Sequence, residues 1–212
     1  LLTMDLPANI TASTGIDAMV HAIEAFTSVN PNNNPISKML SIEALKLLGS
    51  SIEVAVSDGK NIKARSNMLL GSMLAGKAFA NSPVAAVHAL AYPIGGLFNI
   101  SHGLSNSLVL PHVLKFNSLN EDARKNYAYL APNVFKNLEN SKNDEKVCNH
   151  FIDLLENLSK KLKLPYRLRD LEIPEEACNS MAKEAMKQTR LLVNNPRKIE
   201  ESDAFNIYKA AW

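Results

Sequence analysis

A short stretch near the start of the sequence carries a carboxylate and an imidazole at a spacing that suits metal binding. Asp17 and His21 are four residues apart, and on a helix two such side chains lie on one face, one turn apart. Both can therefore reach a single cation, although the same spacing also suits a plain hydrogen bond between them. Their neighbours are apolar, so burying either group would be costly unless it had a partner.

Two further histidines lie in segments that carry few charges. His88 stands within the nearly all-apolar residues 83–92, and His102 follows 14 residues later, beyond Gly95 and Gly96. Taken alone, His88 can be a core histidine with a backbone partner, and His102 a loop histidine near a helix start. A helix, a glycine turn and a new helix start would also fold His102 back towards His88.

Together these side chains make a donor set that suits a borderline divalent cation. Imidazole binds Fe²⁺, Zn²⁺, Co²⁺ and Ni²⁺, and a set without thiolates is not typical of a purely structural zinc site. Four protein donors would leave a coordination position for a substrate oxygen. The residue types therefore suggest a metal site at Asp17, His21, His88 and His102, which spacing alone does not decide.

Helical patterns run through nearly the whole chain and predict an all-α fold, a bundle of helices. No run of alternating β-branched residues qualifies as a strand. Ser13 or Thr14 is expected to cap the first helix, and Gly95 and Gly96 to force a turn. We expect helices at residues 15–26, 35–56, 61–80, 83–92, 121–131, 144–162, 174–190 and 202–212, and one from residue 102 that kinks at Pro111 and runs past it.

Length and composition are those of an ordinary globular protein. The chain has 212 residues, of which 46% are hydrophobic and 21% charged, with a net charge of +2. This charge gives no argument for a nucleic-acid or anionic-membrane partner. No apolar run approaches the roughly 18 residues of a membrane span, and no secretory signal is evident. Cys148 and Cys178 lack CxxC spacing, which favours free thiols in a reducing compartment and a cytoplasmic location.

Small residues and charges are distributed unevenly along the chain. All 8 glycines lie at or before Gly103, whereas only 12 of the charged side chains fall within residues 1–100. We therefore expect one helical metal-binding domain over residues 1–212, with a metal-bearing core half at 1–117 and outer amphipathic helices at 118–212.

Several common catalytic motifs do not occur in the sequence. It contains no GxGxxG, no GxxxxGK[ST], no GxSxG and no HExxH, so a nucleotide-binding half is not evident. Cofactor-binding residues are accordingly left unassigned.

Four segments resemble the iron-containing (group III) alcohol dehydrogenases. Residues 11–26 (TASTGIDAMVHAIEAF) resemble the metal-binding helix of that family, and residues 88–103 (HALAYPIGGLFNISHG) its second metal signature. Residues 110–117 and 194–212 are also similar. The resemblance covers essentially the whole chain, but only the C-terminal helical domain of the family, which it shares with dehydroquinate synthase-like enzymes.

The resemblance implies an NAD(P)-dependent alcohol dehydrogenase or aldehyde reductase, in which an N-terminal α/β domain binds NAD or NADP. A small alcohol or aldehyde would lie in the cleft between the two domains, and the full-length enzyme would form a homo-oligomer such as a dimer. By position in the motifs, Asp17, His21, His88 and His102 would hold a divalent metal, Fe²⁺ foremost and Zn²⁺ as the alternative. The metal would act as a Lewis acid on the substrate oxygen during hydride transfer.

Tyr92 is the catalytic candidate, because it stands where many members of that family have a histidine beside the nicotinamide and others a tyrosine. Its other interpretation is a core aromatic with a satisfied hydroxyl.

The remaining residues of interest have plainer expected roles. Phe98 suits a wall of the site or plain core packing. Glu24 can orient His21, but a solvent-exposed salt bridge is the expected role. We expect His112 to be structural and His150 to lie at the surface.

Two alternatives differ in chemistry. The first is a non-redox metal enzyme of the dehydroquinate synthase-like group, which the Asp-x-x-x-His spacing of residues 17–21 disfavours. The second is a helical metal-binding fragment without catalysis. Because the nucleotide site is expected in the missing N-terminal domain, we also expect the 212 residues alone to be inactive, as an excised domain or truncated product.

Overall fold

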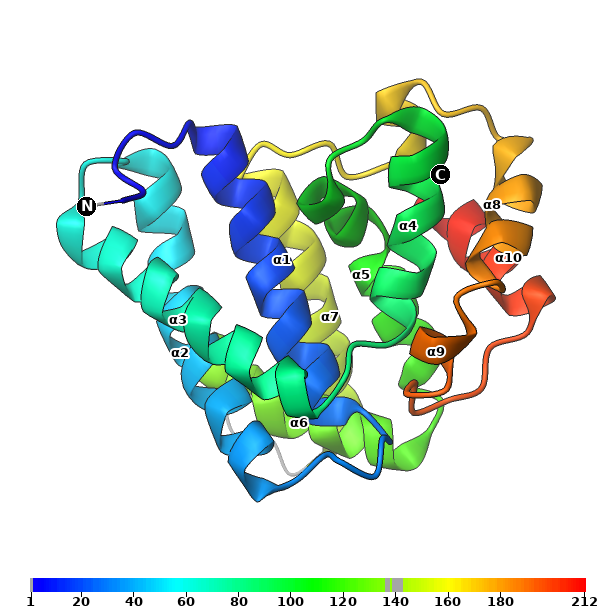
Figure 1. Cartoon of the computed structure of the whole chain (residues 1–212), viewed down its shortest axis with the longest axis horizontal. Helices are drawn as coiled ribbons and strands as arrows, with labels where there is room; N and C mark the ends of the chain where they lie inside the picture. Colours follow the sequence, from blue (N-terminus) through cyan, green and yellow to red (C-terminus); the bar gives the residue numbers. More distant parts are fainter. Residues whose placement is uncertain (1, 136–137, 139–142) are drawn as a thin grey trace.

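Helices make up the regular structure. The computed structural model describes residues 2–135, 138 and 143–212, and within these ranges it contains helices and no strand (Figure 1). The all-α prediction is therefore confirmed. The helices are α1 (Ala8–Thr27), α2 (Pro35–Ser57), α3 (Ile62–Asn81), α4 (Ala86–Phe98), α5 (His102–Asn117), α6 (Glu121–Val134), α7 (Asp144–Lys161), the 3₁₀ helix η1 (Leu168–Leu171), α8 (Ala177–Ala185), α9 (Thr189–Leu192) and α10 (Glu201–Ala211).

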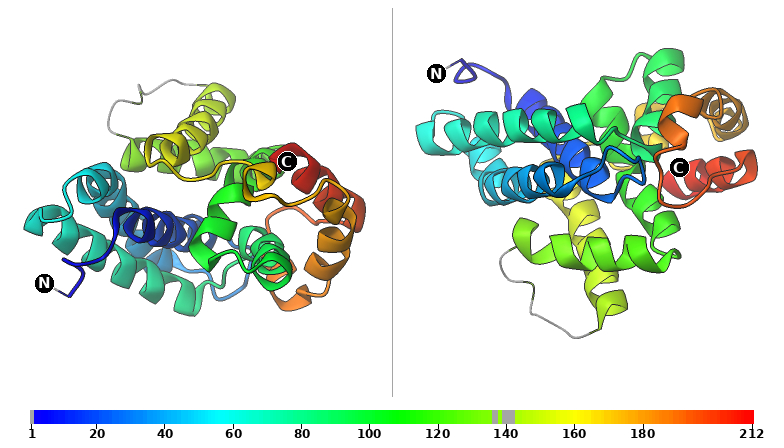
Figure 2. Two further views of the ribbon diagram at one scale, coloured as in Figure 1. Left: turned by 90° about the horizontal axis from the view of Figure 1, so that it is seen from above. Right: turned by 60° about the horizontal axis from the view of Figure 1, so that its bottom comes forward.

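Helix α1 runs through the middle of the molecule. It packs against α2, α3 and α5, while α6 and α7 lie on the side opposite α3 (Figures 1 and 2). Met19, Val20 and Ile23 are fully buried. A helix covered on nearly all sides must be apolar all round, and this explains why Asp17 and His21 have so few polar neighbours in the sequence.

The first helix begins earlier than the sequence predicts. It begins at Ala8 after Pro7, and the hydroxyls of Ser13 and Thr14 donate to the carbonyl of Ile10 within the helix. Ser13 and Thr14 therefore do not cap the helix. The added turns are supported from outside, because the buried guanidinium of Arg65 donates to the hydroxyl of Thr11 and to the carbonyl of residue 6.

Helix α4 does not end before Pro93, and Gly95 and Gly96 do not form the turn. The helix continues to Phe98. Proline removes one intrahelical N–H, but the apolar face that includes Ile94 is fully buried, and that burial offsets the loss. The chain reverses instead at Asn99, which adopts the left-handed conformation with a φ of 57° and whose N–H bonds to the carbonyl of Gly95.

The helix predicted at 174–190 is divided in two. Residues 174–176 form turns that precede α8. After Ala185 the α-helical hydrogen bonds give way to bonds between residues three apart, such as the one from Gln188 N–H to the Ala185 carbonyl, and α8 ends there. The four-residue helix α9 follows. The remaining predicted helices agree with α2, α3, α5, α6, α7 and α10 to within a few residues, and α5 runs past Pro111 as expected.

Cys148 and Cys178 are free thiols, as predicted, and the structure shows that both are buried. Burial raises the pKa of the Cys148 thiol to about 11, so this group stays protonated at neutral pH. Among the described helices, none combines the length and the apolar character needed to cross a membrane.

Candidate metal centre

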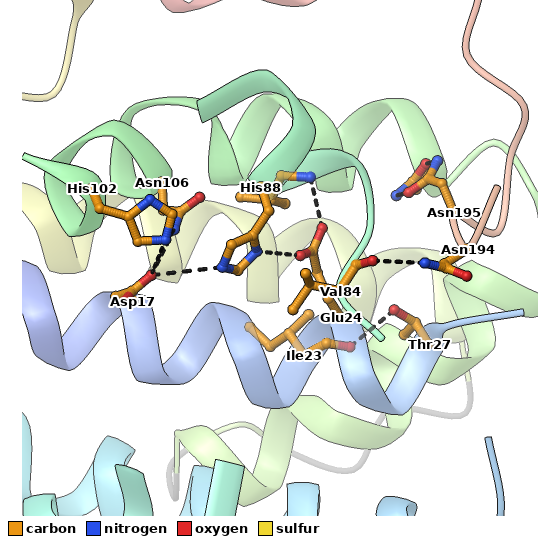
Figure 3. Close-up of polar contacts among 12 residues, drawn as sticks. Asp17, Ile23, Glu24, Thr27, Val84, His88, His102, Asn106, Asn194 and Asn195 are labelled. Carbon is orange, nitrogen blue, oxygen red and sulfur yellow. Dashed lines mark hydrogen bonds and ion pairs between the residues drawn. The ribbon is translucent and has the colours of Figure 1, made fainter. Parts of the chain in front are cut away.

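Four side chains from three helices converge on one point. Asp17 and His21 come from α1, His88 from α4 and His102 from α5, and one possible ligand atom of each lies within 4.8 Å of those of the others. Figure 3 shows Asp17, His88 and His102 facing one another. The four residues singled out in the sequence are therefore brought together.

A close contact between α1 and α5 places His102 beside Asp17. A Cβ atom at Gly103 would lie 2.4 Å from the carbonyl oxygen of Ser13, which is far inside van der Waals contact. Glycine therefore lets the first turn of α5 rest directly on α1. In this position Nε2 of His102 is 3.5 Å from Oδ1 of Asp17.

His88 is the most buried of the four side chains, and one of its ring nitrogens is left free. Its Nδ1 lies 2.6 Å from Oε2 of Glu24, and a carboxylate accepts hydrogen bonds, so Nδ1 carries a proton. In the neutral imidazole Nε2 is then the acceptor. Nε2 is 3.8 Å from Oδ1 of Asp17 and has no hydrogen-bond partner among the described residues. A buried acceptor without a partner is costly, and a cation at this point would satisfy it.

His21 is held between two rings. Its imidazole stacks on Phe79 from α3 and on His88, with ring centroids 4.7 Å apart in each case. Burial lowers the pKa of His21 to about 4, against the opposing effect of the Asp17 carboxylate. The imidazole is therefore neutral at pH 7, which is the form that binds metals.

Asn106 also contributes to the cluster, although the sequence analysis did not single it out. This fully buried residue donates from Nδ2 to Oδ1 of Asp17 at 2.6 Å, and the same nitrogen lies 3.2 Å from Nε2 of His102. It follows His102 by four residues on α5, so helical spacing was a signal that could have revealed it.

Glu24 behaves differently from the sequence expectation. It is not in a solvent salt bridge and does not contact His21 through a hydrogen bond. It is 4% exposed, and its two oxygens accept from His88 Nδ1 and from the backbone N–H of Val87. A carboxylate within an apolar helix is itself a signal of such a buried partner.

The cluster is closed on the side of His88 and open on the side of His102. The side chain of His102 is 45% exposed, and Tyr92 is 37% exposed with its ring 5.8 Å from that of His102. Phe98 packs against the core, in agreement with its plainer interpretation. His150 is exposed.

A large groove lies away from these residues. It has a volume of about 1010 Å³, is lined mainly by α2 and α6, and has none of the four candidate ligands in its wall.

His112 lines a different, smaller cavity, between α5 and α10. Burial lowers the pKa of this histidine.

Comparison with known proteins identifies relatives along the whole chain. Residues 11–212 match the family model for the C-terminal part of the Fe-containing alcohol dehydrogenase family. The chain is 39% identical to long-chain-alcohol dehydrogenase 1 of Geobacillus thermodenitrificans over 100% of its own length and 52% of the relative's. It is 34% identical to 1,3-propanediol dehydrogenase of Citrobacter freundii over 100% of its own length and 53% of the relative's.

A solved structure agrees with these matches. The crystal structure of a 1,3-propanediol oxidoreductase superposes with a TM-score of 0.92 at 33% identity, over 99% of this chain and 53% of that one. The chain thus spans about half the length of the curated relatives it matches, and its match lies in their helical, C-terminal half.

Proposed function

The chain belongs to the Fe-containing alcohol dehydrogenase family, and from this membership we propose that it is the metal-binding half of an NAD(P)-dependent alcohol dehydrogenase or aldehyde reductase. The observation that carries the proposal is the convergence of one carboxylate and three imidazoles around Nε2 of His88, which lacks a hydrogen-bond partner in the described part of the chain. The relatives named above are alcohol dehydrogenases, which favours redox chemistry over the non-redox alternative.

The donor set fits a borderline divalent cation. Membership of the Fe-containing family favours Fe²⁺, with Zn²⁺ as the alternative. Asp17, His21, His88 and His102 would hold it. The cation would supply a Lewis acid for a substrate oxygen, and NAD or NADP would supply the hydride chemistry. The N-terminal nucleotide-binding half, a homodimeric assembly and a cytoplasmic location remain predictions, as does the division of residues 1–212 at residue 117.

The open side of the cluster is where a small alcohol or aldehyde would approach. His102 and Tyr92 border this side. On the other side, His88 and its neighbours on α4, such as Leu90, are buried away from solvent. The closed face of such a reacting centre excludes water, and electrostatic interactions are stronger where water is excluded. Tyr92 would then stand beside the substrate and the nicotinamide, in position to donate from its hydroxyl.

Tyr92→Phe tests this role. If the hydroxyl takes part in proton transfer or orients the substrate, kcat/KM for aldehyde reduction falls by roughly 100-fold, the lower end for such groups. Affinity for Zn²⁺ should not change, because Tyr92 is not in the ligand cluster. Steady-state kinetics of the full-length enzyme measure the first quantity and calorimetry the second. Unchanged kinetics would show that Tyr92 only packs against its neighbours.

Metal titration tests the proposed function directly. We expect the 212-residue chain, stripped of metal, to bind one Zn²⁺ or, under anaerobic conditions, one Fe²⁺ in isothermal titration calorimetry. The same chain should not reduce aldehydes with NADH or NADPH, because the nucleotide site is proposed to lie in the N-terminal half. A chain that binds no divalent metal contradicts the proposal, and rapid turnover by these 212 residues alone contradicts the division of labour.

A further inference from the structure

We propose that Glu24 is the positioning residue of the candidate metal centre: its carboxylate fixes the start of helix α4 and holds His88 in the form that binds a cation. The inference rests on the proposed metal role of the cluster. It assigns a function to a residue outside the four candidate ligands.

The first support is the burial of Glu24 without a cationic partner. The residue is 4% exposed, and within the described part of the chain neither lysine nor arginine forms an ion pair with it; its ion-pair contact is with His88. Burying a carboxylate is costly unless strong hydrogen bonds replace its water. Glu24 has two, each 2.6 Å long, from Val87 N–H and His88 Nδ1.

The second support is the way α4 begins. Ala85, the residue that precedes the helix, offers no side-chain cap, and the first N–H groups of a helix need acceptors. Oε1 of Glu24, which reaches across from α1, accepts from Val87 in the first turn. A negative charge is also favourable at this end of a helix. Because His88 is the next residue, the carboxylate that caps α4 also determines where His88 stands.

The third support is the direction of the imidazole. Figure 3 shows His88 between Glu24 and Asp17, with dashed lines to both. With Nδ1–H donated to Glu24, the lone pair of Nε2 faces the cluster. The other tautomer would direct the Nδ1 lone pair at the Glu24 carboxylate, which is repulsive. Carboxylates that accept from ligand histidines in this way orient the ring and increase its basicity.

Glu24→Gln is the central test, since the amide has nearly the same shape but only one accepting oxygen. That oxygen can serve Val87 or His88, and the amide N–H₂ then faces the other donor. We expect the Kd of the 212-residue chain for Zn²⁺, measured by competition with a chromogenic chelator, to rise by roughly 10–100-fold. An unchanged Kd would overturn the proposal.

Ser82→Ala is the matched control. The Ser82 hydroxyl donates a buried hydrogen bond to the carbonyl of Ala25 on the same helix as Glu24, but it touches none of the candidate ligands. Its removal should lower thermal stability and leave the Kd for Zn²⁺ unchanged. If both variants weaken Zn²⁺ binding equally, Glu24 acts through general stability and the positioning role is wrong.

A measurement on the metal-free wild-type chain separates this inference from the proposed function and needs no variant. Long-range ¹H–¹⁵N correlation spectra report which ring nitrogen of a histidine carries the proton. We expect a protonated Nδ1 and a bare Nε2 at His88. A protonated Nε2 would overturn the inference even if Zn²⁺ binds. The expected tautomer in a chain that binds no metal would overturn the proposed function, and with it the metal role of Glu24, while the hydrogen bond from His88 to Glu24 would stand.

Discussion

Replacing His102 by alanine is expected to weaken Zn²⁺ binding by roughly 100-fold. Structural zinc sites in zinc-finger peptides, which also have four protein donors, bind Zn²⁺ with apparent free energies of about 10–16 kcal/mol, or about 3 kcal/mol per donor. His102 is the candidate ligand best suited to this test, since its side chain is 45% exposed and its loss should leave the fold intact. His88→Ala would instead remove a hydrogen-bond donor from the buried Glu24 carboxylate. Chelator competition measures the Kd, and thermal unfolding of the metal-free chain checks the fold.

His150→Ala is the control for this experiment. The residue lies exposed on α7 and outside the ligand cluster, so its removal should change neither the Kd nor the thermal midpoint. A His102→Ala chain that binds Zn²⁺ as tightly as the wild type would contradict the assignment of His102 as a ligand.

Replacing Gly103 by alanine is expected to have the largest effect on stability among these variants. The added Cβ would lie 2.4 Å from the Ser13 carbonyl oxygen and 3.3 Å from Cβ of Asp17, and backbone atoms cannot yield as a flexible side chain can. Overpacking of this kind costs about 2–3 kcal/mol, which lowers the thermal midpoint of a chain this long by roughly 5–10 °C. Separation of α5 from α1 should also raise the Kd for Zn²⁺.

Gly76→Ala, at a second helical glycine, is expected to stabilise the chain rather than destabilise it. No atom of the described residues lies within 4 Å of the position that a Cβ would take there, so alanine should increase the free energy of unfolding by about 0.5–1 kcal/mol through its higher helix propensity. Differential scanning calorimetry of both variants makes the comparison. A Gly103→Ala chain as stable as Gly76→Ala would show that α1 and α5 do not need their close approach.

Local signals predicted the helices whose ends are set by nearby residues. Helix α2 begins where Asn34 accepts from two N–H groups of the first turn, and α3 begins where the Asn61 side chain accepts from the N–H of Ala64. The failures came where distant contacts decide. Pro93 and the two glycines after it are poor helix formers, but burial of α4 outweighs their propensity, and that burial depends on partners far along the chain.

The same distinction applies to the candidate site. Residue type and spacing singled out the four donors, because an i, i+4 pair on a helix is a local pattern. Their convergence depends on the packing of three helices, which the sequence analysis supported through a family resemblance. Glu24 was expected in a solvent-exposed salt bridge, with His21, three residues away, as the other possible partner. Neither expectation was right, because its partner His88 is 64 residues away and only the packing of α4 on α1 brings the two together.

Because the four donors come from three separate helices, folding is connected to the concentration of free metal ion. A cation could bind tightly only while α1, α4 and α5 are docked, because the unfolded chain cannot gather the same atoms. Binding of this kind shifts the unfolding equilibrium by mass action, by about 2.7 kcal/mol when the free ion is a hundred times its Kd. The bound ion would thus hold the three helices together reversibly, and the fraction of folded protein would rise and fall with the concentration of free metal ion.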